Sequence, residues 1–263
     1  DKITVIRLGK VVGVTSPSSS QEELASMMVG REVDLIPDKP EVKTGKTILS
    51  IKDLSIFNSV GRKIVNNISL EIRAGEILAI AGVQGNGQSE LARALVNLEN
   101  HVTGSIKIND EEILKKSVRD SLRAGVAFIP ESRELDGLIG SFSIAENLIL
   151  DTHDIEPIAK RGQINKEFVR ENAIKLVKEF DVRTQSIFDT SSSLSGGNKQ
   201  KVVLARELSR NVELVIASQP TRGLDVGSIE FVYQRLMAER AANRAVLLIS
   251  SELDEVSALA DRI

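Results

Sequence analysis

Residues 77–89 read Ile-Leu-Ala-Ile-Ala-Gly-Val-Gln-Gly-Asn-Gly-Gln-Ser, and this stretch decides which fold the chain can adopt. Its first five residues are apolar and predict a buried strand, and a helix is predicted from residue 88 to about residue 98. The segment between them has the spacing Gly-x-x-x-x-Gly-Lys-Ser, except that Gln88 stands at the lysine position. Backbone N–H groups in such a turn converge on phosphate oxygens. We therefore expect a nucleotide-binding loop made of Gly82, Val83, Gln84, Gly85, Asn86, Gly87, Gln88 and Ser89.

The missing lysine affects the expected chemistry more than the expected binding. Gln88 keeps a hydrogen-bond donor but carries no charge. A charge-assisted hydrogen bond is worth about 1.5–3 kcal/mol, against about 1 kcal/mol for a neutral one. Nucleotide binding should survive in weakened form, whereas charge stabilisation during phosphoryl transfer should suffer more. Ser89 is a weak candidate ligand for Mg²⁺. A glycine-rich turn without any ligand is the alternative.

Composition excludes several classes of function. The 263 residues suffice for one large α/β domain or two modest ones, and 41% hydrophobic with 27% charged residues is ordinary for a globular protein. A net charge of −3 and only 3% aromatic residues argue against a nucleic-acid partner. No apolar run approaches the ~18 residues of a membrane-spanning helix. Cysteine is absent and the two histidines, His101 and His153, are far apart, so a cysteine-based zinc site or a Ser-His-Asp triad is a poor hypothesis.

Short apolar strands alternate with helical segments along most of the chain. Besides residues 77–81, strands are expected at 126–129, 214–217 and 245–249, which is typical of a parallel sheet covered on both faces. Further strands are expected at 48–52 and 64–72. The region from about 131 to 208 is mostly helical, with Phe168, Ile174, Val177 and Phe180 at roughly helical spacing. We interpret it as an inserted helical lobe.

The first 32 residues predict a small separate unit. Two strands are expected around the turn at Gly9, followed by a serine-rich turn and a helix from about 21 to 29, whose start has a capping box at Ser20 and Glu23. Residues 33–46, with prolines and glycine among charges, predict a linker. The chain ends Ala-Asp-Arg-Ile and begins Asp-Lys-Ile-Thr-Val, so its head could continue the sequence of its tail. This pattern predicts a segment of a tandem repeat, with the end of one unit followed by most of the next. Coincidence is the alternative.

A second motif lies about 110 residues after the glycine-rich loop. Residues 194–200 read Leu-Ser-Gly-Gly-Asn-Lys-Gln and precede a helix expected at 201–208, and residues 220–225 read Pro-Thr-Arg-Gly-Leu-Asp. Here the chain resembles the ATP-binding cassette (ABC) superfamily, whose signature is LSGGQ or LSGGNQQ and whose D-loop aspartate corresponds to Asp225. The resemblance covers residues 48–263 almost continuously. It implies an α/β, P-loop NTPase-like cassette with a mainly parallel sheet core, an antiparallel β subdomain and a helical subdomain at about 131–208, and it implies ATP and Mg²⁺ as ligands.

The chain departs from this family where charge is needed. The Walker B Asp-Glu pair corresponds to Ser218 and Gln219, the Q-loop glutamine to Glu131 and the switch histidine to Ser251. Loss of a general base alone typically lowers a rate 10²–10⁴-fold. Together with Gln88, these departures imply that no catalytic residue of this site is intact. The isolated chain is therefore expected to show no ATPase activity.

In this family two cassettes pack head to tail, and each ATP lies between the Walker motifs of one and the signature of the other. The resemblance thus implies that this signature acts in trans on a first cassette of the same polypeptide, through Leu194, Ser195, Gly196, Gly197, Asn198 and Gln200. A vestigial signature is the alternative. Residues 27–32 resemble the end of the first cassette in fused sugar and nucleoside importers. Residues 1–32 would then close a preceding cassette, and residues 47–263 would form the second nucleotide-binding domain, truncated at its C-terminus.

Within that group, residues 180–184 and 218–227 are most similar to the nucleoside-uptake branch, and the ribose/galactose branch is the alternative. The resemblance implies transmembrane permease subunits as partners, a solute-binding protein as an indirect one, no nucleic acid, and a peripheral position on the cytoplasmic face of the cell membrane. A non-hydrolysing, nucleotide-sensing regulatory module is a competing hypothesis. A DNA-repair or translation factor is disfavoured because it would need coiled-coil or basic insertions.

Two structural expectations follow from the resemblance. The junction at residues 131–146, with Leu138, Ile139, Phe142 and Ile144, is expected to receive the permease's coupling helix, unless these residues only pack the lobe. A complete cassette has strands after residue 263, so an open sheet edge is expected beside residues 245–249. Residues 3–14 are expected to form ordered β-structure docked on this core or on that of a neighbouring molecule.

Overall fold

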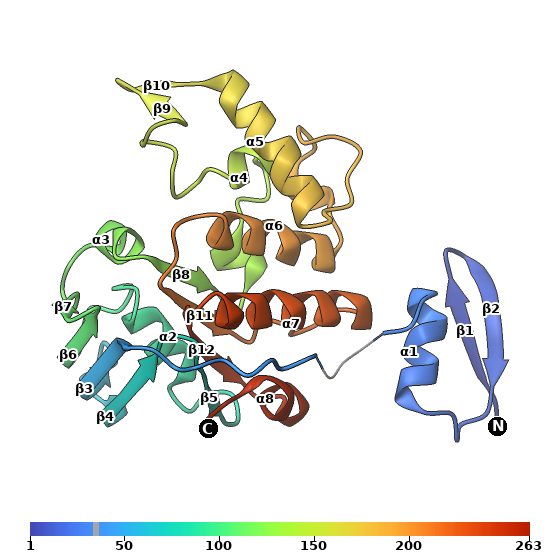
Figure 1. Ribbon diagram of the computed structural model, residues 1–263, viewed down its shortest axis with the longest axis horizontal. Helices are drawn as coiled ribbons and strands as arrows, with labels where there is room; N and C mark the ends of the chain where they lie inside the picture. The colour runs from blue at the N-terminus through green and yellow to red at the C-terminus, as the bar shows by residue number, and fades with distance from the viewer. Residues whose placement is uncertain (34–36) are drawn as a thin grey trace.

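The computed structural model describes residues 1–33 and 37–263, so part of the predicted linker at 33–46 lies outside the described residues. Its centre is a four-stranded parallel sheet in the order β5-β12-β11-β8 (Figure 1). The bounds are β5, Ile77–Ala81; β8, Val126–Ile129; β11, Leu214–Ser218; and β12, Ala245–Ser250. The four predicted core strands are confirmed, each to within one residue. Uninterrupted apolar runs could be located from sequence because both faces of each strand are covered.

Alternate residues of the central strands enter different cores. In β11, Val215 and Ala217 belong to one hydrophobic cluster, whereas Leu214 and Ile216 belong to the other, and all four side chains are fully buried. Successive strand residues point to opposite faces, so each face needs its own cover. The sheet is therefore the middle layer of the cassette.

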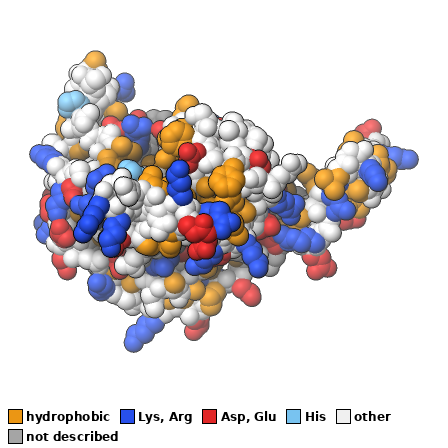
Figure 2. All heavy atoms as spheres, turned by 90° about the horizontal axis from the view of Figure 1, so that it is seen from above, with side chains coloured by type: hydrophobic (Ala, Val, Ile, Leu, Met, Phe, Trp, Pro, Cys, Tyr) orange, Lys and Arg blue, Asp and Glu red, His pale blue; other side chains and the backbone are white. Residues whose placement is uncertain are grey.

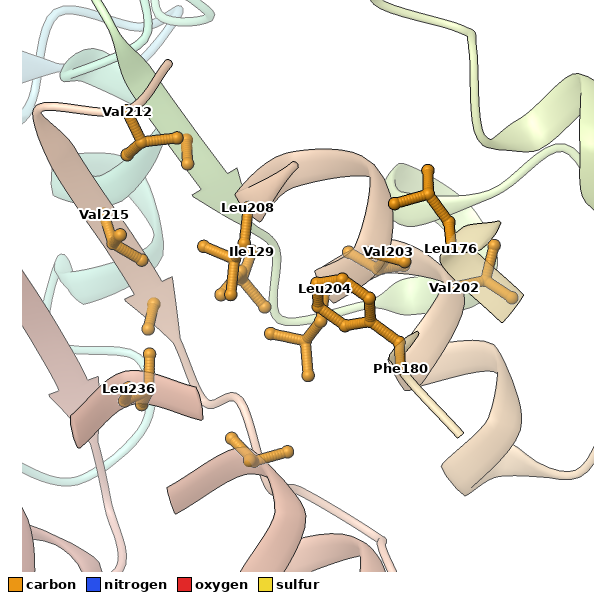
Figure 3. Close-up of a cluster of buried hydrophobic side chains, with 14 of the residues drawn as sticks. Ile129, Leu176, Phe180, Val202, Val203, Leu204, Leu208, Val212, Val215 and Leu236 are labelled. Carbon is orange, nitrogen blue, oxygen red and sulfur yellow. The ribbon is translucent and has the colours of Figure 1, made fainter. Parts of the chain in front are cut away.

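One face is covered by helices (Figure 1). These are α6, Gly196–Leu208; α7, Val226–Ala241; and α8, Leu253–Leu259. Above α6 lie α4, Ile144–Asn147, and α5, Lys166–Glu179, with the short strands β9, Ala159–Lys160, and β10, Gln163–Ile164. Figure 3 shows side chains from this cluster, including Val203 and Leu204 of α6, Ile129 of β8 and Leu176 of α5. Helix α6 thus joins the sheet to the helical lobe.

Helix α5 contains the helical spacing expected at Phe168, Ile174 and Val177. Its buried residues are Val169, Ala173 and Leu176, and Phe180 is buried just beyond its end. Ile174 is instead half exposed, while Phe168 and Val177 are only partly buried. The apolar residues of this helix therefore spread over more than one face, and not all of them reach the core.

The other face carries an antiparallel sheet in the order β4-β3-β6-β7. Its strands are β3, Thr47–Phe57; β4, Lys63–Arg73; β6, Val102–Ile108; and β7, Glu111–Glu112. Between the two sheets lies α2, Gln88–Ala94, and α3, Val118–Arg123, flanks β8. Helix α2 is shorter than predicted. Asn97 has φ +59° and its amide donates to the Ile113 carbonyl and Ser121 Oγ, both at 2.9 Å, so a side-chain-supported turn replaces the last helical turn.

The N-terminal residues form a small unit of their own. The strands β1, Ile3–Arg7, and β2, Lys10–Thr15, form a two-stranded sheet against α1, Gln21–Val29, and Ser20 Oγ accepts from the Glu23 amide at 3.1 Å. Figure 2 shows this unit standing out from the cassette, with apolar side chains on its visible surface. It meets the cassette at α7, where Arg31 pairs with Glu230 at 2.5 Å.

The expected open edge beside β12 is wrong. Strand β12 lies between β5 and β11, and the edges of the described sheet are β5 and β8. Arg262 continues beside Leu78 of β5 in a parallel bridge, so the end of the chain already pairs with that edge. The hairpin β1-β2 is ordered, as expected, but joins no strand of the central sheet. Within 1–33 and 37–263, no helix has the length and apolar character needed to span a membrane.

Candidate nucleotide site and signature turn

The glycine-rich loop connects the carboxyl end of β5 to the start of α2, as expected. Gly85 and Gly87 have φ +90° and +88°, a region that side chains rarely adopt. A Cβ on Gly87 would also lie 2.9 Å from Val65 Cγ2, whereas Gly85 has open space. Residues 83–86 are exposed. The backbone is therefore shaped as a phosphate loop and is open to solvent.

Gln88 does not reach out across this loop. A Cβ placed on Gly82 would lie 2.7 Å from Gln88 Nε2, so the Gln88 amide is folded back over the first residue of the loop. It offers a neutral donor there.

Glu131 provides an acidic contact that the sequence alone did not predict. Its Oε1 accepts from Gln84 Nε2 at 2.6 Å, and its Oε2 accepts from Ser89 Oγ at 2.8 Å. Oε1 also forms a close ion pair with Arg222, in the turn after β11. One carboxylate thus ties two loop residues to a third segment of the chain.

Ser218, Gln219 and Ser251 are brought together at the carboxyl ends of β11 and β12. Ser218 is buried, and Gln219 is buried with φ +48°, a strained value for a side-chain-bearing residue. The Gln219 Oε1 accepts from the Ser251 amide at 3.2 Å and from Ser251 Oγ at 3.1 Å. The three side chains carry no charge, and the Gln219 amide oxygen is engaged by Ser251. Nothing at these three positions can take a proton from water at neutral pH.

The signature turn, residues 194–200, lies at the start of α6. Ser195 is its exposed N-cap residue, and Ser195 Oγ accepts from Asn198 Nδ2 at 3.0 Å and from the Asn198 amide at 3.4 Å. A Cβ on Gly197 would collide with Ser228 Oγ, so a glycine is needed for α7 to approach. Gln200 is buried, whereas Gly196 is half-buried. Gly197 is buried under α7, so Ser195 is the exposed residue at the start of this 13-residue helix, whose N-terminus carries partial positive charge.

Asp225 lies beside this turn. It is the N-cap residue of α7, where its Oδ1 accepts from the Ser228 amide at 3.0 Å and its Oδ2 from Ser228 Oγ at 2.7 Å. The predicted D-loop and signature residues are therefore neighbours, fixed through Ser228.

Comparisons with known proteins agree with this arrangement. Residues 65–222 match the family described as ABC transporter. The chain belongs to the ABC transporter family. The whole chain is 44% identical to the nucleoside import ATP-binding protein NupA of Lactococcus lactis and 42% identical to the guanosine import ATP-binding protein NupO of Bacillus subtilis, and it covers 52% of each. It is 35% identical to the ribose import ATP-binding protein RbsA of Clostridium tetani, of which it covers 51%. The chain thus spans about half the length of these ABC relatives.

Solved structures support the fold. A nucleotide-free ATP-binding cassette from an ABC transporter matches with TM-score 0.68 and 20% identity, over 82% of this chain and 86% of that one. A dimeric bacterial ABC transporter cassette matches with TM-score 0.68 and 21% identity, over 80% of this chain and 91% of that one. The fold is that of an ABC cassette, with its parallel and antiparallel sheets, and cassettes of this family bind ATP with Mg²⁺.

The ABC cassette has a small cavity beside its phosphate loop. It measures about 160 Å³, and its lining includes Ser89, Glu131, Ser218 and Arg222. Hydroxyl and carboxylate oxygens are the ligands that Mg²⁺ prefers. The donors that would hold Mg²⁺ here are therefore Ser89 and Glu131, and the ion would offset negative charge on a phosphate.

Sequence reasoning missed two members of this site, Arg222 and the side-chain role of Gln84. The Arg222 side chain reaches Glu131 across 91 positions of sequence, and no local pattern predicts such a contact. The sequence did offer one signal for Arg222. Residues 88, 218 and 219 are neutral, so a charged side chain within residues 220–225 could have been considered as a member of the site.

A buried acid, Glu255, lies under the same turn. Burial raises its pKa, despite hydrogen bonds from Ser250 and Thr221, the latter at 2.9 Å. Its Oε2 has no hydrogen-bond partner. Glu255 thus supports the turn that carries Arg222 from below and does not reach the phosphate loop.

Proposed function

We propose that this chain is the second ATP-binding cassette of a two-cassette ABC importer, and that its signature turn completes the ATP site of the first cassette. Its own phosphate loop would bind nucleotide weakly and would not hydrolyse it. The observation that carries this proposal is the contrast between the two sites. The signature has an exposed N-cap serine and both glycines of the family motif, while the chain's own site has neutral residues at 88, 218, 219 and 251.

The halved coverage of the relatives fits this position in a longer polypeptide. In the proposal, residues 1–32 close the preceding cassette, residues 33–46 link the two, and residues 47–263 form the second nucleotide-binding domain with a helical subdomain at about 131–208. A contact between α1 and α7 supports it. Val29 packs on Gly227, two residues after Asp225, and Arg31 pairs with Glu230 one turn further on. The N-terminal unit thus lies on the signature side of the cassette.

The proposed solute is a nucleoside. The support is comparative, because the nucleoside and guanosine import proteins are 44% and 42% identical to this chain and the ribose import protein 35%. A ribose- or galactose-type sugar is the alternative. Uptake of radiolabelled guanosine and ribose by membrane vesicles that contain the complete transporter separates the two. ATP-dependent uptake of ribose alone would contradict the nucleoside assignment.

The proposed partners are transmembrane permease subunits and, indirectly, a solute-binding protein, with the cassette peripheral to the cytoplasmic face of the cell membrane. The support is an apolar cavity of about 360 Å³ between the sheet and the helical lobe. Leu138 and Ile139 line it, and Leu135 at its rim is 85% exposed. Ile144 instead packs the core, and Phe142 lies outside the cavity lining. Of the four residues expected to face the permease, two therefore line this cavity.

Crosslinking tests the permease contact. The chain has no cysteine, so Leu135→Cys introduces the only thiol of this segment. In the assembled transporter it should crosslink to a permease cysteine. Val60→Cys, which is 83% exposed in the turn between β3 and β4, is the matched control and should not. Equal yields from the two positions would count against the permease contact.

A further inference from the structure

A short helical segment, Arg133–Gly137, packs against the signature turn from a distant part of the sequence. Lys199 Nζ donates to Glu134 Oε1 at 2.7 Å, across 65 positions of sequence. A Cβ on Gly196 would lie 3.0 Å from Arg133 Nη2 and 3.6 Å from its Cζ. The Arg133 guanidinium therefore lies against the first residue of α6, and the lack of a side chain on Gly196 leaves room for it.

One nitrogen of this guanidinium is held in place and another is free. Arg133 Nη1 donates to the Arg222 carbonyl at 2.9 Å, in the turn that carries the D-loop motif. Nη2 is the atom nearest to a Cβ built on Gly196, and it lies 3.8 Å from a Cβ built on Gly223. Among the described residues Nη2 has no hydrogen-bond acceptor, and it is not buried. A free donor therefore lies between the signature turn and the D-loop.

The positive charge of Arg133 is not balanced by its surroundings. In the part of the chain that the structure describes, its Nε is buried without an acceptor and no carboxylate forms an ion pair with it. Of the neighbouring cations, Lys199 is paired with Glu134 at 2.7 Å. Arg222 is paired with Glu131. A guanidinium cannot lose its proton in a protein, so partial burial without a partner costs free energy. An anion at Nη2 would offset that cost.

Under the proposed function this surface faces the ATP of the other cassette. Ser195 and Gly223 are both exposed. The acidic residue of the D-loop, Asp225, is engaged elsewhere, because its two oxygens accept from the amide and Oγ of Ser228 at 3.0 and 2.7 Å. Arginine donors form short, charge-assisted hydrogen bonds to phosphate oxygens, about twice as strong as neutral ones. The free Nη2 of Arg133 is therefore suited to a phosphate.

We propose that Arg133 contacts a phosphate of the ATP that the other cassette holds, beside Ser195 of the signature. Nη1 fixes the guanidinium to the D-loop backbone, and Nη2 supplies a charged donor. The chain would then bring a positive charge to the other site, although its own phosphate loop, residues 82–89, carries none. This inference deepens the proposed function and rests on it, since the signature must face another cassette.

Steady-state ATPase measurements on the proposed two-cassette protein test this role of Arg133. Arg133→Ala should lower kcat about 100-fold, because the charged donor to the phosphate is lost. Arg183→Ala is the matched control and should behave as wild type. The Arg183 side chain is 81% exposed beside the same turn, and its backbone amide, which alanine retains, donates to Asn198 Oδ1 at 2.8 Å.

A second measurement separates a phosphate contact from a role in folding. Trapping of ADP with aluminium fluoride, which mimics the phosphoryl group during transfer, should fall at least about tenfold in Arg133→Ala. The affinity for N-methylanthraniloyl-ATP should change less than about threefold. If Arg133→Ala does not fold, Arg133→Lys carries the test. A lysine keeps the charge but cannot hold the Arg222 carbonyl and a phosphate together, so its turnover and its trapping should be intermediate.

The outcomes distinguish Arg133 from the signature. Wild-type turnover in Arg133→Ala, or in a folded Arg133→Lys if that variant carries the test, would overturn the role of Arg133. If Ser195→Asp still abolished turnover, the signature's proposed role in trans would stand. Equal losses of ATP affinity and of trapping in Arg133→Ala, with a lowered melting temperature, would also overturn the phosphate contact. Wild-type turnover in both Arg133→Ala and Ser195→Asp would overturn the proposed function as well.

Discussion

The phosphate loop and the signature turn have similar backbones but differ in their side chains. Both are glycine-containing turns at the start of a helix, α2 in one case and α6 in the other. The phosphate loop retains its backbone shape but has Gln88 for lysine and faces Ser218, Gln219 and Ser251. The signature turn has Ser195, Gly196 and Gly197 at the positions of the family motif, with Lys199 where LSGGNQQ has glutamine. This difference supports the proposal that the phosphate loop binds nucleotide without hydrolysing it.

An ATPase assay tests the proposed difference between the phosphate loop and the signature turn with the largest expected effect. The isolated chain should show ATPase activity no greater than a buffer blank, at least about 10²-fold below an active cassette, because the general base and the charged lysine are missing. Gln88→Lys alone should not restore activity, since Ser218 and Gln219 still bring no carboxylate. Robust, Mg²⁺-dependent release of phosphate from purified chain would show that the two regions do not differ as proposed.

Stability measurements on the two signature glycines test whether the turn is fixed by packing against α7. Gly197→Ala should lower the free energy of unfolding by about 1–3 kcal/mol, because its Cβ would collide with Ser228 Oγ in the tightly packed start of α7. Gly196→Ala meets only the flexible end of Arg133, at 3.0 Å, and should cost less. Urea unfolding of the two variants provides the comparison. If they lose equal stability, Gly197 is not fixed by packing against α7.

The N-terminal unit adds a test on the signature side. Deleting residues 1–32 should lower the melting temperature by about 2–6 °C, because the Val29 contact with Gly227 and the Arg31–Glu230 ion pair are lost. Aggregation of the shortened chain would have the same meaning. An unchanged melting temperature, with fast amide exchange throughout residues 2–14, would contradict docking.

The smallest expected effect concerns Glu255, which contacts Thr221 in the turn after β11. Its pKa is raised above the ordinary value of 4.5 by burial, so the folded state favours the protonated form and loses stability as the pH rises through the raised pKa. Glu255→Gln cannot ionise. Its stability relative to wild type should therefore increase from about pH 4.5 toward pH 7.5, as measured by urea unfolding across that range. A gap that does not change with pH would show that Glu255 keeps its charge when buried.

The parts that sequence could predict are those that depend on neighbours along the chain. Strands β5, β8, β11 and β12 are short apolar runs, and the phosphate loop and the signature turn are continuous motifs. Each could be located before any tertiary contact was known. A strand buried on both faces appears as a continuous apolar run, and a tight turn as a pattern of glycines, within a few neighbouring residues.

The parts that sequence could not predict depend on contacts between distant segments. Helix α2 ends at Ala94 because Asn97 is held by Ile113 and Ser121, not by its own helix. The edge of the sheet is at β5, not beside β12, because the strand order differs from the chain order. The Glu131–Arg222 pair also joins distant segments, so the sequence showed the neutral residues at 88, 218 and 219 but not this ion pair.

Inserting one negative charge at the signature turn or at the phosphate loop, in the proposed two-cassette protein, tests the central claim most directly. Ser195→Asp keeps an N-cap residue for α6, so the fold is preserved, but it places a charge where a phosphate of the other cassette would bind. Gln88→Glu places the same charge at the chain's own phosphate loop. We predict that Ser195→Asp lowers steady-state ATP turnover at least about 100-fold and Gln88→Glu less than about tenfold. Equal losses, or a larger loss from Gln88→Glu, would contradict a signature that acts in trans beside a silent site.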